Sequence, residues 1–262
     1  MSYREIIPIP ALQPFIKFFW TLEIGTGELG VERVFPDGCI ELIFHLKTPF
    51  STVTKEGIFI QSKALIVGQI TKAMHFLPSP QSQILALRFT PFGLAAFTNI
   101  PIDLFSGTEV AVDDIWGEDA RILAERVNSL TVDAAVIVVQ QFLLSKYRHK
   151  HINTQIGKIA GNILTSASKK SVQYWADNAN LSERQFNRNF KANVGVSPKE
   201  FIKIARFNKV LAIFGNETPA NLGAFAQQCG YYDQAHFIKD FREYTGTTPG
   251  SFAQDNKTFI PF

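Results

Sequence analysis

The chain has 262 residues, 46% of them hydrophobic, and a formal net charge of +3. That length is enough for two domains with separate cores, and two distant cysteines, Cys39 and Cys229, exclude a disulfide framework or a cysteine-based zinc cluster. Early charge and three prolines in the first 15 residues exclude a secretory signal, and the short apolar runs exclude a membrane span, so we expect a soluble, cytoplasmic protein with no membrane partner.

Charge divides the chain into two unlike parts. Residues 1–149 hold 12 Lys and Arg against 15 Asp and Glu, a net charge of −3. Residues 150–262 hold 14 against 8, a net charge of +6. A basic C-terminal part joined to an acidic N-terminal part is typical of a nucleic-acid-binding module attached to another domain.

Short β-rich runs, broken by proline and glycine, fill the first 110 residues. Pro36, Asp37 and Gly38 predict a turn, because proline presets one turn angle and glycine tolerates positive φ. The regular spacing of strands and turns predicts a barrel- or sandwich-like domain. The strand candidates are residues 15–24, 31–35, 39–46, 57–60, 64–68, 73–76 and 84–89.

Three charged residues of this domain, Asp37, Glu41 and Arg88, are candidates for an effector pocket. The alternative, which the sequence favours, is that Asp37 caps the turn while Glu41 and Arg88 lie on exposed sides of strands.

The histidines do not indicate a metal site or an enzyme. His45 and His75 stand alone on strand-like runs, and His149 and His151 lie in a basic linker. The sequence also has no Gly-rich phosphate loop and no nucleophile motif. We therefore predict no metal, no cofactor and no catalytic residue.

From residue 113 the apolar period becomes helical. One helix is predicted to end near Asn128, and a second, capped by Thr131, spans residues 132–147. The second helix carries apolar residues on more than one face, so it packs either on the barrel or on a partner protomer. A linker at 148–151 leads to the first helix of the C-terminal domain, 152–165.

A repeat organises the C-terminal part. Residues 181–201 and 232–252 align without a gap at an offset of 51, with Phe, Gly and Pro in register. Such a repeat indicates one supersecondary unit used twice. Short amphipathic helices, Val172–Asn178 and Leu222–Gln228, precede the two copies, and a long helix, Pro198–Phe214, joins them.

Each copy has the residues that begin and end a capped helix. Ser182 with Gln185 predicts a capping box in the first copy, and Asp233 is the predicted N-cap of the second. A short helix, a turn and a capped helix form a helix-turn-helix motif, whose second helix lies in the major groove. In the first copy, Leu181 and Phe186 form the predicted hydrophobic staple, and Gly195 ends the helix. In the second copy, Tyr232 and Phe237 form the staple, and Gly246 ends the helix.

These motifs resemble the AraC/XylS family of transcription regulators, over about residues 150–254. The resemblance implies a double helix-turn-helix DNA-binding domain. The stretches that carry it are 175–176 (WA), 182–190 (SERQFNRNF), 195–198 (GVSP), 230–233 (GYYD), Phe237, Lys239 and Phe241.

The N-terminal part resembles the domain found with a less-characterised subset of these regulators. In the wider family this position holds a β-barrel-like sensor or dimerisation domain, so the resemblance implies architecture and no particular ligand. The matching stretches are 19–20 (FW), 34–39 (VFPDGC), 65–68 (LIVG), 87–93 (LRFTPFG) and 113–117 (DDIWG).

The resemblance also implies which residues contact DNA bases: Arg184, Asn187, Arg188, Gln234, Ala235 and Lys239. Arginine pairs with guanine, and asparagine or glutamine with adenine. Because Ala235 and its neighbour Ile238 cannot hydrogen-bond a base, we expect the first motif to carry more of the specificity. The alternative is that these are only exposed polar residues at helical spacing. The phosphate candidates are Ser182 and Asp233, through their amide groups, and Lys191, Lys203, Arg206, Lys209 and Arg242.

The sequence therefore predicts a regulator that binds double-stranded DNA, with a small-molecule effector acting on the N-terminal domain. In the alternative, that domain only mediates dimerisation or protein contacts. RNA polymerase and a second copy of the chain are the other candidate partners. The expected division is a β-rich domain (1–112), a helical connector (113–150), the DNA-binding domain (151–254) and a tail (255–262).

Overall fold

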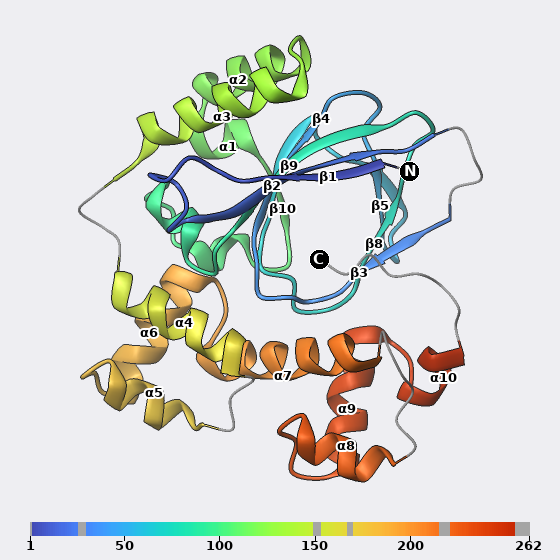
Figure 1. Cartoon of the computed structure of the whole chain (residues 1–262), viewed down its shortest axis with the longest axis vertical. Helices are drawn as coiled ribbons and strands as arrows, with labels where there is room; N and C mark the ends of the chain where they lie inside the picture. Colours follow the sequence, from blue (N-terminus) through green and yellow to red (C-terminus); the bar gives the residue numbers. More distant parts are fainter. Residues whose placement is uncertain (1, 26–29, 149–152, 167–169, 215–220, 255–262) are drawn as a thin grey trace.

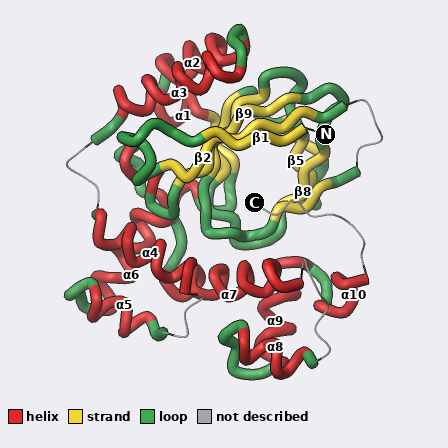
Figure 2. The backbone as a smooth tube through the Cα atoms, viewed as in Figure 1, coloured by secondary structure: helices red, strands yellow, loops and turns green. Residues whose placement is uncertain are grey.

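The computed structural model describes residues 2–25, 30–148, 153–166, 170–214 and 221–254. Within these ranges a β-rich N-terminal part is followed by three connecting helices and then by an all-helical C-terminal part (Figures 1 and 2). The predicted fold class is therefore confirmed. The predicted tail and the predicted linker histidines, His149 and His151, lie outside the described residues.

Two antiparallel sheets form the N-terminal part. In the described ranges the larger sheet has six strands in the order β1-β2-β9-β4-β7-β10, and the smaller has four in the order β3-β8-β5-β6. In the larger sheet the strands are β1 (Ser2–Ile6), β2 (Ile16–Glu23), β9 (Gln83–Phe89), β4 (Glu41–His45), β7 (Ala64–Val67) and β10 (Glu109–Ala111). In the smaller sheet they are β3 (Glu32–Val34), β8 (Met74–Leu77), β5 (Ser51–Val53) and β6 (Ile58–Ile60).

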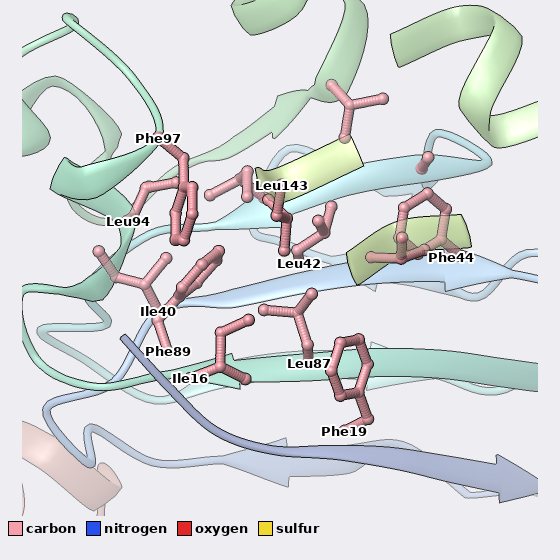
Figure 3. Close-up of a cluster of buried hydrophobic side chains, with 14 of the residues drawn as sticks. Ile16, Phe19, Ile40, Leu42, Phe44, Leu87, Phe89, Leu94, Phe97 and Leu143 are labelled. Atoms are coloured by element: carbon pink, nitrogen blue, oxygen red, sulfur yellow. The ribbon is translucent and has the colours of Figure 1, made fainter. Parts of the chain in front are cut away.

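The two faces of the larger sheet bury different clusters, because successive side chains of a strand point to opposite faces. On β4, Leu42 and Phe44 join the cluster covered by helices, which also receives Leu143 (Figure 3). Ile43, between them, joins a second cluster that includes Phe76 of the smaller sheet. The candidate effector pocket includes polar residues on that second face.

Each of the seven predicted strand segments overlaps an observed strand, whereas β1, β5 and β10 were not predicted. Ser2–Ile6 reads SYREI, and four of its five residues are exposed, so it has no apolar alternation to reveal it. It is a strand because its backbone pairs with β2 from Ser2↔Glu23 to Ile6↔Phe19. Strands held by backbone pairing alone leave little trace in sequence.

The helical connector differs from its prediction at one glycine. The single helix expected before Asn128 is two helices, α1 (Val112–Trp116) and α2 (Glu118–Asn128), separated by Gly117 at φ 66° and ψ −146°. Residues with a Cβ rarely adopt these angles, so the chain turns here. The third helix, α3 (Val132–Lys146), packs on the barrel with Val139 and Leu143 fully buried.

The C-terminal part contains two motifs built around one shared helix. The first buried cluster surrounds Phe186 and Phe190, and the second surrounds Phe237 and Phe241. The joining helix, α7 (Pro198–Phe214), matches its predicted bounds and contributes to both clusters. The other helices are α4 (Thr154–Ser166), α5 (Val172–Asn178), α6 (Glu183–Val194), α8 (Leu222–Gln228), α9 (Gln234–Thr245) and α10 (Pro249–Gln254), the last not predicted.

Candidate nucleic-acid interface and its contact with the N-terminal domain

The first motif caps its second helix, α6, as predicted. The Ser182 hydroxyl accepts a hydrogen bond from the Gln185 amide at 3.3 Å, and the Gln185 side chain accepts one from the Ser182 amide at 3.2 Å. Leu181 packs against the cluster that holds Phe186, and Gly195 ends the helix at φ 102°. These contacts fix α6 with its phenylalanines inward and its opposite face outward.

The second motif caps α9 with Asp233, whose carboxylate accepts a hydrogen bond from the His236 amide at 2.7 Å. The predicted staple is wrong by one position. Tyr232 is 86% exposed, whereas Tyr231 is 4% exposed and its ring lies 5.4 Å from that of Phe237. Because the turn places Tyr231 inward, Tyr232 projects from the start of the helix instead of packing on the core.

The outward face of α6 presents two of its three predicted base contacts freely. Arg184 and Arg188 are exposed. Asn187 is half-buried, and its side-chain amide donates to the Glu183 carbonyl at 2.8 Å. This side chain must therefore turn away from its own helix before it can read a base.

The outward face of α9 is less polar. Gln234, Ala235 and Lys239, the predicted base contacts, are exposed. Ile238, which cannot hydrogen-bond a base, packs partly against the second core cluster. His236, half-buried between these positions, has a polar ring at the helix surface that sequence reasoning missed.

The phosphate candidates fall into different environments. Lys191 and Arg242 are exposed near the C-terminal ends of the two recognition helices. Lys209 is half-buried and its Nζ donates to the Gln228 carbonyl at 2.9 Å. Arg206 is also half-buried. The amide of Ser182 is taken by Gln185 in the capping box, so it is not available to a phosphate.

Lys203 differs most from its prediction as a phosphate contact, because carboxylates surround it. Its Nζ lies 3.5 Å from Glu200, 3.2 Å from Glu243 and 3.9 Å from the buried Asp240. Tyr244 completes the group by donating its hydroxyl hydrogen to Glu200 at 2.7 Å. This network joins α7 to α9, so Lys203 orients the second recognition helix against the joining helix.

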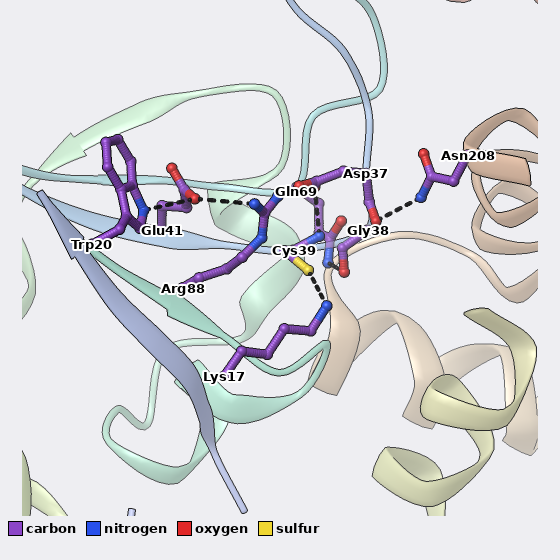
Figure 4. Close-up of polar contacts among 9 residues, drawn as sticks. All are labelled: Lys17, Trp20, Asp37, Gly38, Cys39, Glu41, Gln69, Arg88 and Asn208. Carbon is purple, nitrogen blue, oxygen red and sulfur yellow. Dashed lines mark hydrogen bonds and ion pairs between the residues drawn. The ribbon is translucent and has the colours of Figure 1, made fainter. Parts of the chain in front are cut away.

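The structure brings the three effector-pocket candidates together on the inner face of the larger sheet (Figure 4). Arg88 is 3% exposed and forms an ion pair with Asp37, and its other terminal nitrogen lies 3.7 Å from Glu41. The expectation that Arg88 and Glu41 lie on exposed sides of strands is therefore wrong. Both lie on the strand face that looks toward the smaller sheet, which the alternation of β4 and β9 dictates.

Burial shifts the pKa values of the ionisable groups in this cluster. It raises the pKa of Glu41 to about 7, against a hydrogen bond from the Trp20 indole and the charge of Lys17, which lower it. It also lowers the pKa of Arg88 to about 10. Lys17 Nζ donates to Cys39 Sγ at 3.0 Å, although burial still raises the pKa of that thiol.

The turn that holds Asp37 contacts the DNA-binding part directly. Asp37 caps the turn as predicted, by accepting a hydrogen bond from the Cys39 amide at 2.8 Å. Its backbone oxygen accepts a second one from the side-chain amide of Asn208 on α7, also at 2.8 Å (Figure 4). Gly38 has φ +81°, and a Cβ there would lie 3.0 Å from Phe201. Residues of the turn therefore lie against both the joining helix and the first core cluster.

Further contacts tie the N-terminal part to each motif. Phe35, just before the turn, packs edge-on against Phe207 and Phe252 of the second cluster. On the side of the first motif, the Ser106 hydroxyl donates to the Gly195 carbonyl at 2.5 Å. Asp103 lies 3.5 Å from Lys191, so a predicted phosphate contact already has an acidic partner.

Metal-binding clusters and membrane-spanning helices are both absent from the part of the chain that the structure describes. Among the described residues, no three His, Cys, Asp or Glu side chains gather as a metal site would require. His45 lies buried and hydrogen-bonds Gln61 at 3.0 Å. No helix in the described part of the chain combines the length and apolar character needed to cross a membrane.

Comparison with known proteins finds two family matches. Residues 4–111 match a family described as "Domain of unknown function (DUF6597)", and residues 175–255 match one described as "Helix-turn-helix domain". The chain is 32% identical over 77 residues to the HTH-type transcriptional regulator MtrA of Neisseria gonorrhoeae, a match that covers 29% of this chain and 25% of that protein. It is 25% identical over 115 residues to an HTH-type regulator of Haemophilus influenzae, covering 44% and 37%. The chain thus spans between a quarter and two fifths of the length of the curated relatives it matches.

Among solved structures, ToxT of Vibrio cholerae is similar at 12% identity and a TM-score of 0.45, with 90% of this chain and 97% of that chain covered. The DNA-binding domain of AdpA, solved with a target DNA, is similar at 19% identity and a TM-score of 0.36, covering 38% and 90%.

Proposed function

The chain has an AraC/XylS-type helix-turn-helix domain behind an N-terminal domain of the DUF6597 family, and we propose that it is a sequence-specific regulator of transcription that binds double-stranded DNA. Helices α6 and α9 would enter two neighbouring segments of the major groove on one side of the duplex, about one helical turn apart.

The observation that carries this proposal is the duplication of one capped unit on a shared helix. Both recognition helices bury phenylalanines four residues apart, end at a left-handed glycine and leave a polar, partly basic face outward. Because α7 contributes to both cores, the two faces are held at a fixed separation. A structural role alone would not need two outward faces of this kind.

The base contacts we propose are Arg184, Asn187 and Arg188 in the first motif and Gln234, Ala235 and Lys239 in the second. Arginine at the first motif can pair with guanine through two hydrogen bonds. Lys191, Arg206, Lys209, Arg242 and the amide of Asp233 are the proposed phosphate contacts, which position the protein on the duplex. Lys203 is left out because three carboxylates already surround it.

We further propose that the N-terminal domain controls DNA binding. Support comes from the chain of contacts that runs from Arg88 through Asp37 to Asn208, and from there to the helix shared by both motifs. A small-molecule effector that displaced Asp37 from Arg88 would disturb this series of contacts. In the alternative, the domain serves dimerisation or protein contacts, with a second copy or RNA polymerase as partner. We expect the protein to act in the cytoplasm and not as an enzyme.

The test is selection of bound sequences from a random duplex library by the purified full-length protein at near-physiological salt. Recovery of a motif with two short elements about one turn apart supports the proposal. Salt-sensitive binding without any enriched sequence would contradict it, because two base-reading helices must prefer some sequences over others.

A further inference from the structure

The second recognition helix contains a buried carboxylate at a position where its neighbours are apolar. Asp240 is 3% exposed and lies one turn from Phe237 and Tyr244, both fully buried. A buried carboxylate is costly unless other groups neutralise it. Its Oδ2 atom accepts no hydrogen bond from the described residues. The Nε2 atom of His236 lies 3.4 Å from that oxygen, as an ion-pair contact if the ring is protonated.

Asp240 shares the positive charge of Lys203 with two other carboxylates. From α7, Lys203 and Arg206 are the cations that face it, and Lys203 also lies 3.5 Å from the carboxylate of Glu200. From α9, Glu243 adds a third carboxylate and His236 is the remaining basic group. The neighbouring phenols are Tyr231, in the turn before the helix, and Tyr244. In this network two permanent cations, Lys203 and Arg206, accompany three carboxylates, so a positive charge on His236 would complete the balance. Burial raises the pKa of Asp240, whereas the charge of Lys203 lowers it.

The imidazole of His236 is held from two sides and open on a third. Tyr231 packs against it with ring centroids 5.3 Å apart and an interplanar angle of 82°. Asp240 lies at its Nε2 edge. The side chain is nevertheless 39% exposed, in the first turn of α9 beside the exposed Gln234 and Ala235. A carboxylate at Nε2 keeps a proton on that nitrogen, so Nδ1 is the atom left for a ligand.

We propose that His236 is a DNA contact of the second recognition helix, that it takes up a proton on binding, and that Asp240 is its positioning residue. This inference rests on the proposed function. A protonated ring donates from Nδ1 to an oxygen or nitrogen acceptor of the DNA, which is a phosphate oxygen or the acceptor edge of a guanine. The phosphate field of the duplex favours the charged ring, so DNA binding and proton uptake are coupled.

The test measures affinity of the full-length protein for its selected duplex by fluorescence anisotropy at pH 6 and pH 8 and constant ionic strength. Wild-type protein is expected to gain about fivefold more affinity on going to pH 6 than His236→Gln, within the tenfold per pH unit that one proton allows. Because the readout is a difference between two variants, titration elsewhere, such as at Glu41, cancels. His75→Gln, which removes a histidine from β8, is expected to keep the wild-type difference.

Asp240→Asn keeps the shape of the side chain and removes its charge. It is expected to reduce the extra gain at pH 6 while leaving the salt dependence at pH 8 unchanged, a split that a merely structural role would not produce. Scanning the bases under α9 separates the two acceptors, since a guanine contact gives a preference at one base pair that His236→Gln abolishes and a phosphate contact does not.

Equal pH dependence in wild-type protein and His236→Gln would overturn the inference while leaving DNA binding itself in place. Failure of the wild-type protein to bind any duplex at either pH would overturn the inference and the proposed function together.

Discussion

The side-chain amide of Asn208, on the helix shared by both motifs, donates a hydrogen bond to the backbone oxygen of Asp37 at 2.8 Å. The carboxylate of the same Asp37 pairs with the buried Arg88. One residue thus touches the interior of the N-terminal sheet with its side chain and the DNA-binding part with its backbone. A change at Arg88 can therefore affect α7 through Asp37 alone.

Asn208→Ala should lower the free energy of unfolding by about 1 kcal/mol, because it removes one hydrogen bond between partly buried groups. It should also change the affinity for a two-element DNA site, since α7 loses a contact with the turn at Asp37. Urea unfolding and anisotropy titration measure the two effects. Asn128→Ala, at an exposed position of α2, is the matched control and should change neither. Unchanged affinity in Asn208→Ala would contradict control through this contact.

Glu41 predicts how stability depends on pH. Its folded pKa is raised from 4.5 to about 7, so between these values the folded state holds a proton that the unfolded state has lost. The free energy of unfolding should therefore fall as pH rises through this window and level off above it, by at most about 3 kcal/mol. Urea unfolding at pH 5 and pH 8 measures the fall.

Glu41→Gln carries no titrating group, so it should show a smaller fall between pH 5 and pH 8 and greater stability than wild type at pH 8. Glu125→Gln, at an exposed position of α2, should retain the wild-type dependence. A Glu41→Gln protein whose stability falls as steeply as that of wild type would show that Glu41 is not the group responsible.

Local rules predicted most of the DNA-binding part. Capping residues, glycines and apolar spacing act over a few residues, so α7 and the capping box at Ser182 follow from sequence alone. The prediction that Tyr232 forms the staple was wrong, because the preceding turn determines which of two adjacent tyrosines points inward. The acidic surroundings of Lys203 were not predicted, because Asp240 and Glu243 lie about 40 positions away. Helical spacing says that such a residue is polar, and it cannot say which charges surround it.

The N-terminal part was less predictable for a related reason. Strand alternation places Arg88 and Glu41 on one face, but the choice of which face is buried depends on the second sheet. The same holds for Asn208, whose partner lies 171 positions earlier in the chain. No local pattern marks an asparagine on a helix as an interdomain contact.

Arg188→Ala and Lys191→Ala should have different consequences. Arg188 is exposed on the base-reading face, so its loss should cost about 1–3 kcal/mol of discrimination at one base pair. Lys191 lies near the C-terminal end of the same helix beside Asp103, and it would exchange that partner for a phosphate. Its loss should weaken all duplexes alike and reduce the salt slope by about one. Identical effects of the two changes would refute the assignment of roles.

The first motif should carry more of the sequence specificity than the second. It presents two exposed arginines, whereas the second presents Ala235, which cannot hydrogen-bond a base, and Ile238, which packs on the core. Single base-pair substitutions across the selected site should therefore cost more affinity under α6 than under α9. Larger costs under α9 would contradict this expectation.

The spacing of the two DNA elements tests most directly whether both motifs read the same face of one duplex. Inserting about five base pairs between the elements rotates one of them to the opposite side of the helix, and about ten restore its direction at a greater distance. Because α7 holds the two cores together, the five-pair insertion should reduce affinity to that of a duplex carrying the first element alone. Affinity that is unchanged by this insertion would show that the two helices do not act as one reader.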